Sequence, residues 1–166
     1  MKKEDSKKTC FFAVAALVVA ADQVSKLLFL SFPLEYEVKA AGIRLLGFQL
    51  LRNTGAAFGM LKGNAFILAV VSAVFIAIVL AKLKEVKKAG LSLPMALICG
   101  GAAGNLVDRI FRGYVIDFVS IINIPYFNLA DASISIGMLL AIMLLLKKEH
   151  KKTKKKGINL KENKNI

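Results

Sequence analysis

Four apolar stretches, each close to the length of a membrane-spanning helix, dominate this chain and limit what it can fold into. They cover residues 11–31, 64–81, 93–111 and 129–146, and few charged side chains interrupt them. A helix that crosses a bilayer needs about 20 mostly apolar residues. The hydrophobic fraction of 57% exceeds the roughly 45–50% of an ordinary soluble domain. The pattern predicts an all-α membrane protein with four transmembrane helices in one domain, residues 1–146, followed by a Lys-rich tail at 147–166.

The basic residues gather at the ends of these stretches rather than over a folded face. Of the 24 Lys and Arg residues, four lie at 2–8, four at 82–88 and nine at 147–164. Cytoplasmic segments beside membrane helices carry an excess of basic residues. We therefore expect both termini and the 82–92 loop to be cytoplasmic, and the 32–63 and 113–128 segments to face outward. Nucleic-acid binding is disfavoured, because the tail is of low complexity and lacks interleaved aromatic residues.

The outer segment 32–63 is not apolar enough to cross a bilayer. Its residues 36–39 and 43–51 alternate partly between apolar and polar side chains, which is typical of short strands. We expect a small extracytoplasmic β-sheet between the first two helices. A cleaved signal peptide at 1–21 is an alternative. The apolar run continues beyond Ala21 to Leu30, which favours a retained helix.

Asp117 and Asp131 stand out in this apolar context. They are the only acidic residues between Arg112 and Glu149, and a carboxylate next to lipid is costly enough to indicate function. The third helix runs outward and ends before Asp117, whereas the fourth begins near Leu129 and runs inward. We therefore expect both carboxyls near the outer boundary of the hydrocarbon. Two carboxyls at one site share a proton and can activate water against an amide carbonyl. Asp131 alone could equally serve as a helix cap.

Further polar residues share helix faces within the apolar stretches. Asp22 and Lys26 are four residues apart on the first helix and can pair. Shortly after a group of glycines, one face of the third helix carries Asn105, Asp108 and Arg109. The segment Asn-Thr-Gly-Ala-Ala-Phe-Gly at 53–59 suits a tight polar loop before the second helix. Each of these features alone is more simply explained as packing between helices.

The chain has few residues of the kind that bind metals. Its two cysteines, Cys10 and Cys99, fall at the start of one apolar stretch and inside another, and its single histidine is His150 in the Lys-rich tail. Zinc and related metals need several such ligands at suitable spacing. We expect neither a disulfide nor a metal site.

Taken together, five phrases of the sequence resemble the motif series of the signal peptidase II (lipoprotein signal peptidase) family. They are Asp-Gln-Val-Ser-Lys at 22–26, Asn-Thr-Gly-Ala-Ala-Phe-Gly at 53–59, Gly-Gly-Ala-Ala-Gly-Asn-Leu-Val-Asp-Arg at 100–109, Val-Ile-Asp-Phe at 115–118 and Phe-Asn-Leu-Ala-Asp at 127–131. Order, spacing and predicted topology agree from residue 22 to about residue 137. One departure is the absence of the tryptophan that family members often carry before the last phrase; Ile-Pro-Tyr at 124–126 occupies that stretch.

The resemblance implies an intramembrane aspartyl endopeptidase of the bacterial cytoplasmic (inner) membrane, with Asp117 and Asp131 as its catalytic pair. Its substrate would be a prolipoprotein with a diacylglyceryl cysteine, cleaved just before that cysteine. Membrane lipid and globomycin-type inhibitors would be further partners, and no cofactor or metal is implied. Positions that line the family's site or position its substrate match Asn53, Gly55, Asn105, Asp108, Arg109, Asn128 and Ala132. Asp22 and Lys26 match residues that stabilise the fold and the site.

Two other classes of protein fit parts of the pattern. A small proton-linked transporter could use Asp22, Asp108 or Asp131, but such proteins place the key acid near the midplane of the bilayer. Asp22 does lie near mid-span, yet Lys26 can neutralise it, and the richest polar set is at the outer boundary. A non-catalytic scaffold leaves the outer aspartates without a purpose. The sequence therefore favours the peptidase.

Overall fold

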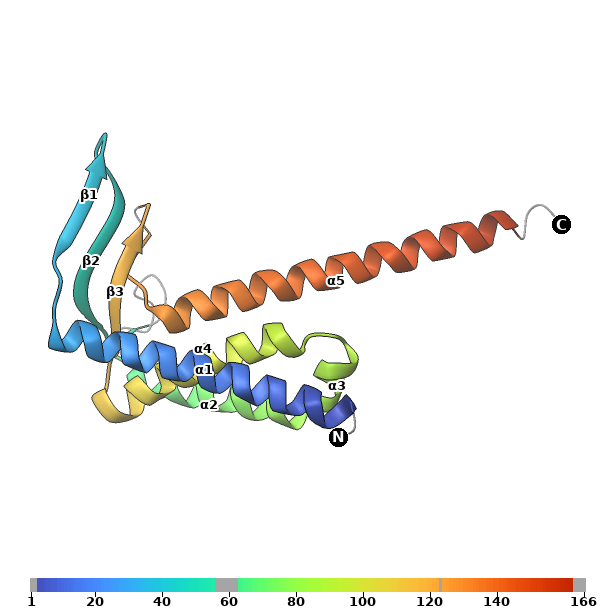
Figure 1. The fold of residues 1–166 in the computed structure, drawn as a ribbon, viewed down its shortest axis with the longest axis horizontal. Coiled ribbons are helices and arrows are strands. Elements are labelled where there is room, and N and C mark those ends of the chain that lie inside the picture. Colours follow the sequence, from blue (N-terminus) through green and yellow to red (C-terminus); the bar gives the residue numbers. More distant parts are fainter. Residues whose placement is uncertain (1–2, 56–62, 123, 163–166) are drawn as a thin grey trace.

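The computed structural model describes residues 3–55, 63–122 and 124–162, and combines a helical bundle with a small sheet at one end (Figure 1). The helices are α1 (Lys3–Ser31), α2 (Ala65–Ala81), α3 (Leu83–Lys88), α4 (Ser92–Arg112) and α5 (Leu129–Glu162). The strands are β1 (Tyr36–Ala40), β2 (Ile43–Asn53) and β3 (Val115–Ile121). Helix α4 is central, because it packs against α1, α2 and α5.

The predicted apolar stretches all lie in helices, although three boundaries differ. Helix α1 already begins at Lys3, a short helix α3 occupies part of the predicted 82–92 loop, and α5 continues to Glu162 instead of ending near Leu146. Lysine is a good helix former, which explains the extension into the Lys-rich tail. Two helical segments, Thr9–Ser31 and Leu129–His150, are long and apolar enough to cross a membrane, and Ala65–Ala81 is apolar but shorter. The arrangement as four membrane spans therefore stays a prediction.

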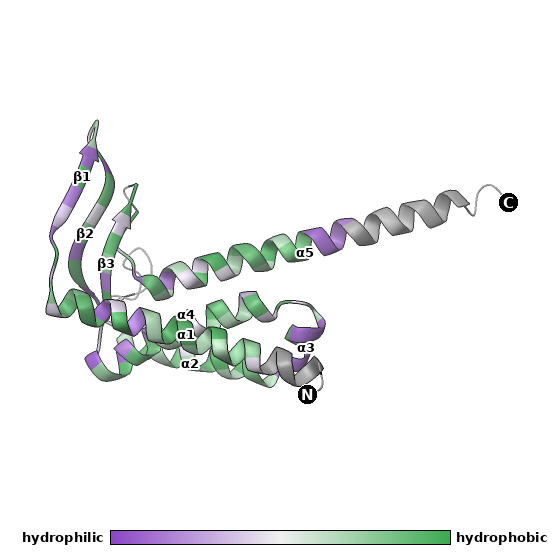
Figure 2. Cartoon of the chain, in the orientation of Figure 1, coloured by the Kyte–Doolittle hydropathy of each residue, from purple (hydrophilic) through white to green (hydrophobic). Residues whose placement is uncertain are grey.

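The outward faces of the long helices are apolar (Figure 2). Large exposed side chains include Leu17 on α1, Phe66 and Val71 on α2, and Leu139 and Met143 on α5. On a soluble protein, a large exposed apolar surface marks a site of contact with a membrane or with another protein. On a bundle of this composition, it is the surface expected to meet lipid tails.

Three glycines let α4 approach its neighbours closely. A Cβ at Gly100 would lie 2.8 Å from the Ala15 carbonyl oxygen of α1. A Cβ at Gly101 would lie 2.4 Å from the Ala130 carbonyl oxygen of α5. Small residues at such contacts are typical of packed membrane helices. The third, Gly104, faces Asp22 and is described with the site below.

The strands form one antiparallel sheet in the order β1-β2-β3. The two strands predicted between the first two helices are confirmed as β1 and β2. The third strand was not predicted from the sequence. Strand β3 reads Val-Ile-Asp-Phe-Val-Ser-Ile and is buried on both faces over most of its length, so it lacks the alternation that marks a half-exposed strand.

Strand β3 brings the segment after α4 back over the bundle. Helix α4 ends at Arg112, where Gly113 takes a left-handed φ of 76°, a conformation that glycine adopts without strain. Phe118 of β3 then stacks on Phe29 of α1 with ring centroids 4.2 Å apart, and Phe29 also stacks on Phe48 of β2. This aromatic stack joins the sheet to the C-terminal end of α1.

Candidate active site

Asp117 projects from β3 into a pocket beside α5. Side chains alternate along a strand, and Val115 and Asp117 both line the pocket, whereas Phe118 faces α1. The Asp117 side chain accepts hydrogen bonds from Asn53 Nδ2 at 2.8 Å and from Asn128 Nδ2 at 2.7 Å. Burial raises the pKa of the Asp117 carboxyl to about 6, and the negative charge of Asp131 adds to this, although both amide donors oppose it.

Asp131 lies in the first turn of α5 and helps to start that helix. Asn128 Oδ1 accepts a hydrogen bond from the Asp131 N–H at 2.9 Å, while Asp131 Oδ2 accepts a longer one, 3.4 Å, from the Asn128 N–H. This reciprocal pair is a capping box, so the helix-cap role considered from the sequence is correct. It does not occupy the whole carboxyl, because Oδ1 accepts a hydrogen bond from Asn105 Nδ2 at 2.8 Å.

Three asparagines thus supply donors to the two carboxyls, and each amide has its orientation set by another contact. Asn53 Oδ1 accepts from the Gly55 N–H at 2.9 Å. Asn105 Oδ1 accepts from Lys26 Nζ and from Asn128 Nδ2, each at 3.1 Å. Asn128 is fully buried and hydrogen-bonded to both carboxyls. The two aspartates are therefore joined through one residue, because the Asn128 side chain donates to Asp117 and the Asn128 backbone N–H donates to Asp131.

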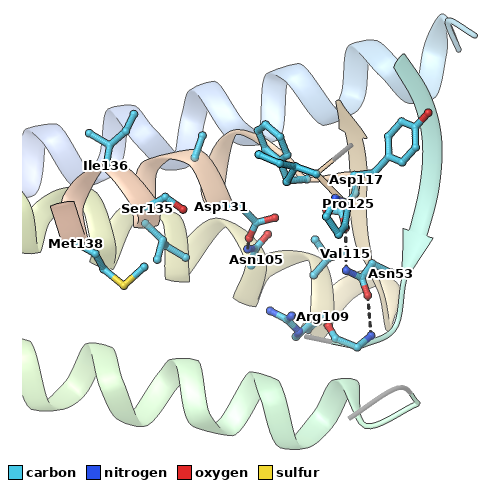
Figure 3. A pocket seen from close by; sticks show the side chains of 16 residues that line it. Asn53, Asn105, Arg109, Val115, Asp117, Pro125, Asp131, Ser135, Ile136 and Met138 are labelled. Atoms are coloured by element: carbon cyan, nitrogen blue, oxygen red, sulfur yellow. Dashed lines mark hydrogen bonds between the residues drawn. The ribbon is translucent and has the colours of Figure 1, made fainter. Parts of the chain in front are cut away.

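Both aspartates line one pocket of about 860 Å³ (Figure 3). One end carries the polar residues Asn53, Asn105 and Arg109, and the far end carries Ile136 and Met138 of α5 (Figure 3). Arg109 donates a hydrogen bond to the Gly55 carbonyl at 3.2 Å. The pocket also has a wall formed by Ile124, Pro125, Tyr126 and Phe127. Pockets with apolar walls and a few convergent polar groups are typical of ligand sites.

Behind the two carboxyls lies a fully buried ionic cluster centred on Lys26. Lys26 Nζ lies 2.7 Å from Asp22 Oδ2 and 2.9 Å from Asp108 Oδ2, and all three side chains are 0% exposed. Asp22 Oδ1 accepts from the Ala130 N–H at 2.9 Å, and Asp108 Oδ2 accepts from the Ile116 N–H at 3.1 Å. Each buried acid thus holds the residue that directly precedes one of the two pocket aspartates.

The cluster requires close approach of α1 and α4. A Cβ at Gly104 would lie 2.6 Å from Asp22 Oδ2, so no larger residue fits there without displacement. Gln23 bridges the same helices through hydrogen bonds of 3.1 Å to Asp22, Asp108 and the Gly104 carbonyl. Arg112 completes the cluster with a 2.5 Å contact to Asp108 Oδ1.

The structure brings most of the predicted site residues together. Those lining the pocket are Asn53, Gly55, Asn105, Arg109, Asp117, Asp131 and Ala132. Asn128 and Asp108 do not line it but support it from behind, Asp108 within the ionic cluster with Asp22 and Lys26. Residues 56–59 of the predicted loop motif, and Lys62, lie outside the described residues.

Sequence reasoning left several contributors unassigned. The i, i+4 spacing of Asp108 and Arg112 could have pointed to their pair, and so could the position of Gln23 beside Asp22. Helical spacing from Asp131 could also have found part of the pocket wall, because Ile134, Ser135 and Met138 follow it at three, four and seven residues. The wall at 124–127 belongs to an irregular segment and has no such periodic signal.

The chain is similar in sequence and in structure to known proteins. The model of the family "Signal peptidase (SPase) II" matches residues 14–147. A lipoprotein signal peptidase from Halothermothrix orenii is 36% identical over 139 residues, which is 83% of this chain and 96% of that protein. Two solved bacterial membrane enzymes superpose with TM-scores of 0.74 and 0.70. Their sequences are 28% and 29% identical to this chain. The superpositions cover 84% and 83% of this chain, and 89% and 93% of the respective solved chains.

The apolar helices, the small sheet and a pocket with one buried and one half-buried carboxyl are those of a membrane enzyme, the class to which both structural neighbours belong. The family match covers most of the chain and supplies the reaction class, which is proteolysis. The chain belongs to the signal peptidase II family.

Proposed function

We propose that this protein is an intramembrane aspartyl endopeptidase that removes signal peptides from diacylglyceryl-modified prolipoproteins, by cleavage before the lipidated cysteine. The family membership supports the removal of signal peptides from prolipoproteins. The observation that carries the aspartyl mechanism is the convergence of Asp117 and Asp131 in one pocket, each held by amide donors and both joined to Asn128. Asp117 and Asp131 are the proposed catalytic residues.

In this mechanism the pair carries one proton, since two neighbouring carboxyls do not both ionise cheaply. Burial and the nearby charge of Asp131 raise the pKa of Asp117 to about 6, which favours retention of this single proton by the pair. The ionised carboxyl of the pair takes a proton from water, the water oxygen attacks the scissile carbonyl carbon, and the other carboxyl gives its proton to the carbonyl oxygen. Collapse of the tetrahedral intermediate breaks the C–N bond, and the cysteine nitrogen leaves with a proton returned by the pair.

The pocket lining suits a substrate that stays in the membrane. The apolar end, with Ile134, Ile136 and Met138, would contact the signal peptide or acyl chains of the substrate. Arg109 and Asn53 at the polar end would position the peptide around the scissile bond. A globomycin-type inhibitor would occupy the same pocket and block both carboxyls. The chemistry as proposed uses side chains and water alone, with neither metal nor organic cofactor.

The proposal includes a membrane topology. Residues 1–146 would form a single domain of the bacterial inner membrane with four spanning helices. Both termini, including the Lys-rich tail, would be cytoplasmic, because most of the basic residues lie in the termini and the 82–92 loop and cytoplasmic segments are enriched in such residues. The sheet and the two aspartates would then lie near the outer face, where water is available for hydrolysis.

The test is the processing of a synthetic diacylglyceryl prolipoprotein by purified variants. Asp117→Asn and Asp131→Asn should each lower kcat by at least about 10²–10⁴-fold, the usual contribution of a general acid or base. Glu85→Gln is the matched control, because Glu85 is an exposed acid of α3 and does not line the pocket. Thermal unfolding in detergent checks that each variant is folded. Substantial cleavage by either folded aspartate variant would contradict the two-carboxyl mechanism.

A further inference from the structure

A second, smaller hollow lies on the sheet and adjoins the main pocket. Its volume is about 260 Å³, and its lining is Glu35, Tyr36, Glu37, Phe48, Gln49 and Tyr126. Tyr126 lines the main pocket as well, so the two hollows meet at this side chain. The smaller hollow is rich in acidic and hydrogen-bonding groups, in contrast to the apolar end of the larger one.

The Tyr126 side chain is held in place by the sheet. The Arg44 guanidinium lies 5.1 Å from the centre of its ring, a cation–π distance. Gly47 leaves the room for this arrangement, because a Cβ there would lie 2.8 Å from Arg44 Cδ and 3.1 Å from Tyr126 Oη. Arg44 also donates to Glu37 of β1 and, at 3.1 Å, to Ser120 Oγ of β3. The wall between the two hollows is therefore fixed to all three strands.

The orientation in which a signal peptide would lie in the main pocket places the small hollow on the C-terminal side of the scissile bond. The apolar end of the main pocket runs along α5 away from the sheet, past Ile136 and Met138 (Figure 3). A signal peptide held at that end, with its scissile bond at Asp117 and Asp131, must direct its other side toward Tyr126 and the sheet. That side is the hydrophilic mature part of the lipoprotein, which leaves the membrane.

Glu35 is the charged group available to such a segment. Glu37 already pairs with Lys39 at 2.7 Å and with Arg44, and these partners lower the pKa of Glu37. Glu35 is exposed, and no ion pair or hydrogen bond to it is found in the part of the chain that the structure describes. Its carboxylate can therefore meet a cationic or donor side chain of the substrate.

We propose that the small hollow is a subsite for the first residues of the mature lipoprotein after the cysteine, and that Glu35 makes it prefer basic over acidic side chains. The inference rests on the proposed function and adds a specificity to it. Tyr126 would separate the lipid-facing pocket from this subsite.

The experiment compares diacylglyceryl peptides that carry Lys or Glu at each of the first three positions after the cysteine. At low salt the wild-type enzyme should cleave the Lys peptide with a kcat/KM about 1.5- to 5-fold higher at one of these positions, as expected for one exposed charge pair. The difference should lie in KM. Glu35→Gln should abolish the preference, and Glu35→Lys should reverse it.

Glu85→Lys is the matched control, because it makes the same change of charge at an exposed residue of α3, which lies at the opposite end of the bundle from the sheet (Figure 1). An unchanged Lys-to-Glu ratio for Glu35→Lys at all three positions would overturn the inference. So would an equal change in the Glu85→Lys variant, because the effect would then be one of net charge. Failure of the wild-type enzyme to cleave any of the peptides would refute the proposed function itself and the subsite with it.

Discussion

Replacement of Lys26 by Met should destabilise the protein more than the loss of any surface charge. Met has a similar length and no charge, so Lys26→Met leaves the buried Asp22 and Asp108 carboxylates without the cation that lies 2.7 Å and 2.9 Å from them. Removal of one partner from a buried ion pair costs about 3–5 kcal/mol. Arg112 and Gln23 still contact Asp108, so we expect the lower end of that range, about 3 kcal/mol.

The matching measurement is thermal unfolding of purified protein in detergent. A loss of about 3 kcal/mol corresponds to a fall in Tm of roughly 6–12 °C for a chain of about this size. Lys39→Met is the control, because Lys39 Nζ also lies 2.7 Å from a carboxylate, that of Glu37, but the side chains are 58% and 33% exposed. An exposed pair contributes about 0–1 kcal/mol, so its Tm should fall by no more than roughly 4 °C. Equal shifts for the two variants would refute the conclusion that burial makes the Lys26 cluster important.

Two further predictions concern pH and topology. The Asp117 carboxyl has a pKa of about 6 in the folded protein, against an ordinary value of 3.8. The unfolded chain therefore releases this proton first, and stability should fall as pH rises from about 4 to 6. The Tm of wild type should decline relative to that of Asp117→Asn over this window, and a constant difference would argue against the raised pKa. In a background of Cys10→Ser and Cys99→Ala, a membrane-impermeant maleimide should label Lys39→Cys in right-side-out vesicles and Glu85→Cys in inverted ones; the reverse pattern would overturn the assignment of the sheet to the outer face.

The sequence was sufficient to predict that the two aspartates lie close together, as they do in one pocket. The ends of two consecutive helices are enough for this prediction: α4 ends at Arg112, five residues before Asp117, and α5 begins at Leu129, two residues before Asp131. Such positions follow from local apolar runs, which are readable without any knowledge of tertiary contacts. The two strands β1 and β2 were predictable for the same reason, because each shows part of its alternation in the sequence.

The sequence could not reveal how β3 enters the sheet. Ile116 and Phe118 are buried on one side and Val115 and Asp117 on the other, so apolar and polar positions do not alternate with exposure. One face of the strand packs on α1 and the other lines the pocket, so the strand can be recognised only from the tertiary structure. The contacts from Asp22 to the start of α5 and from Asp108 to β3 could not be predicted from the sequence either. Neither contact follows from the repeat of a helix or a strand.

The ionic cluster also explains why a site of two repelling carboxyls can keep its geometry. Asp22 holds the N–H of Ala130 and Asp108 holds the N–H of Ile116, and these residues directly precede Asp131 and Asp117. Lys26 binds both acids and orients Asn105, which in turn donates to Asp131. Through these contacts, Lys26 of α1 helps to fix the position of β3 relative to the start of α5. Stability and activity should accordingly fall together in Lys26→Met, whereas Asp117→Asn, which leaves the cluster intact, should lose activity while the protein stays folded.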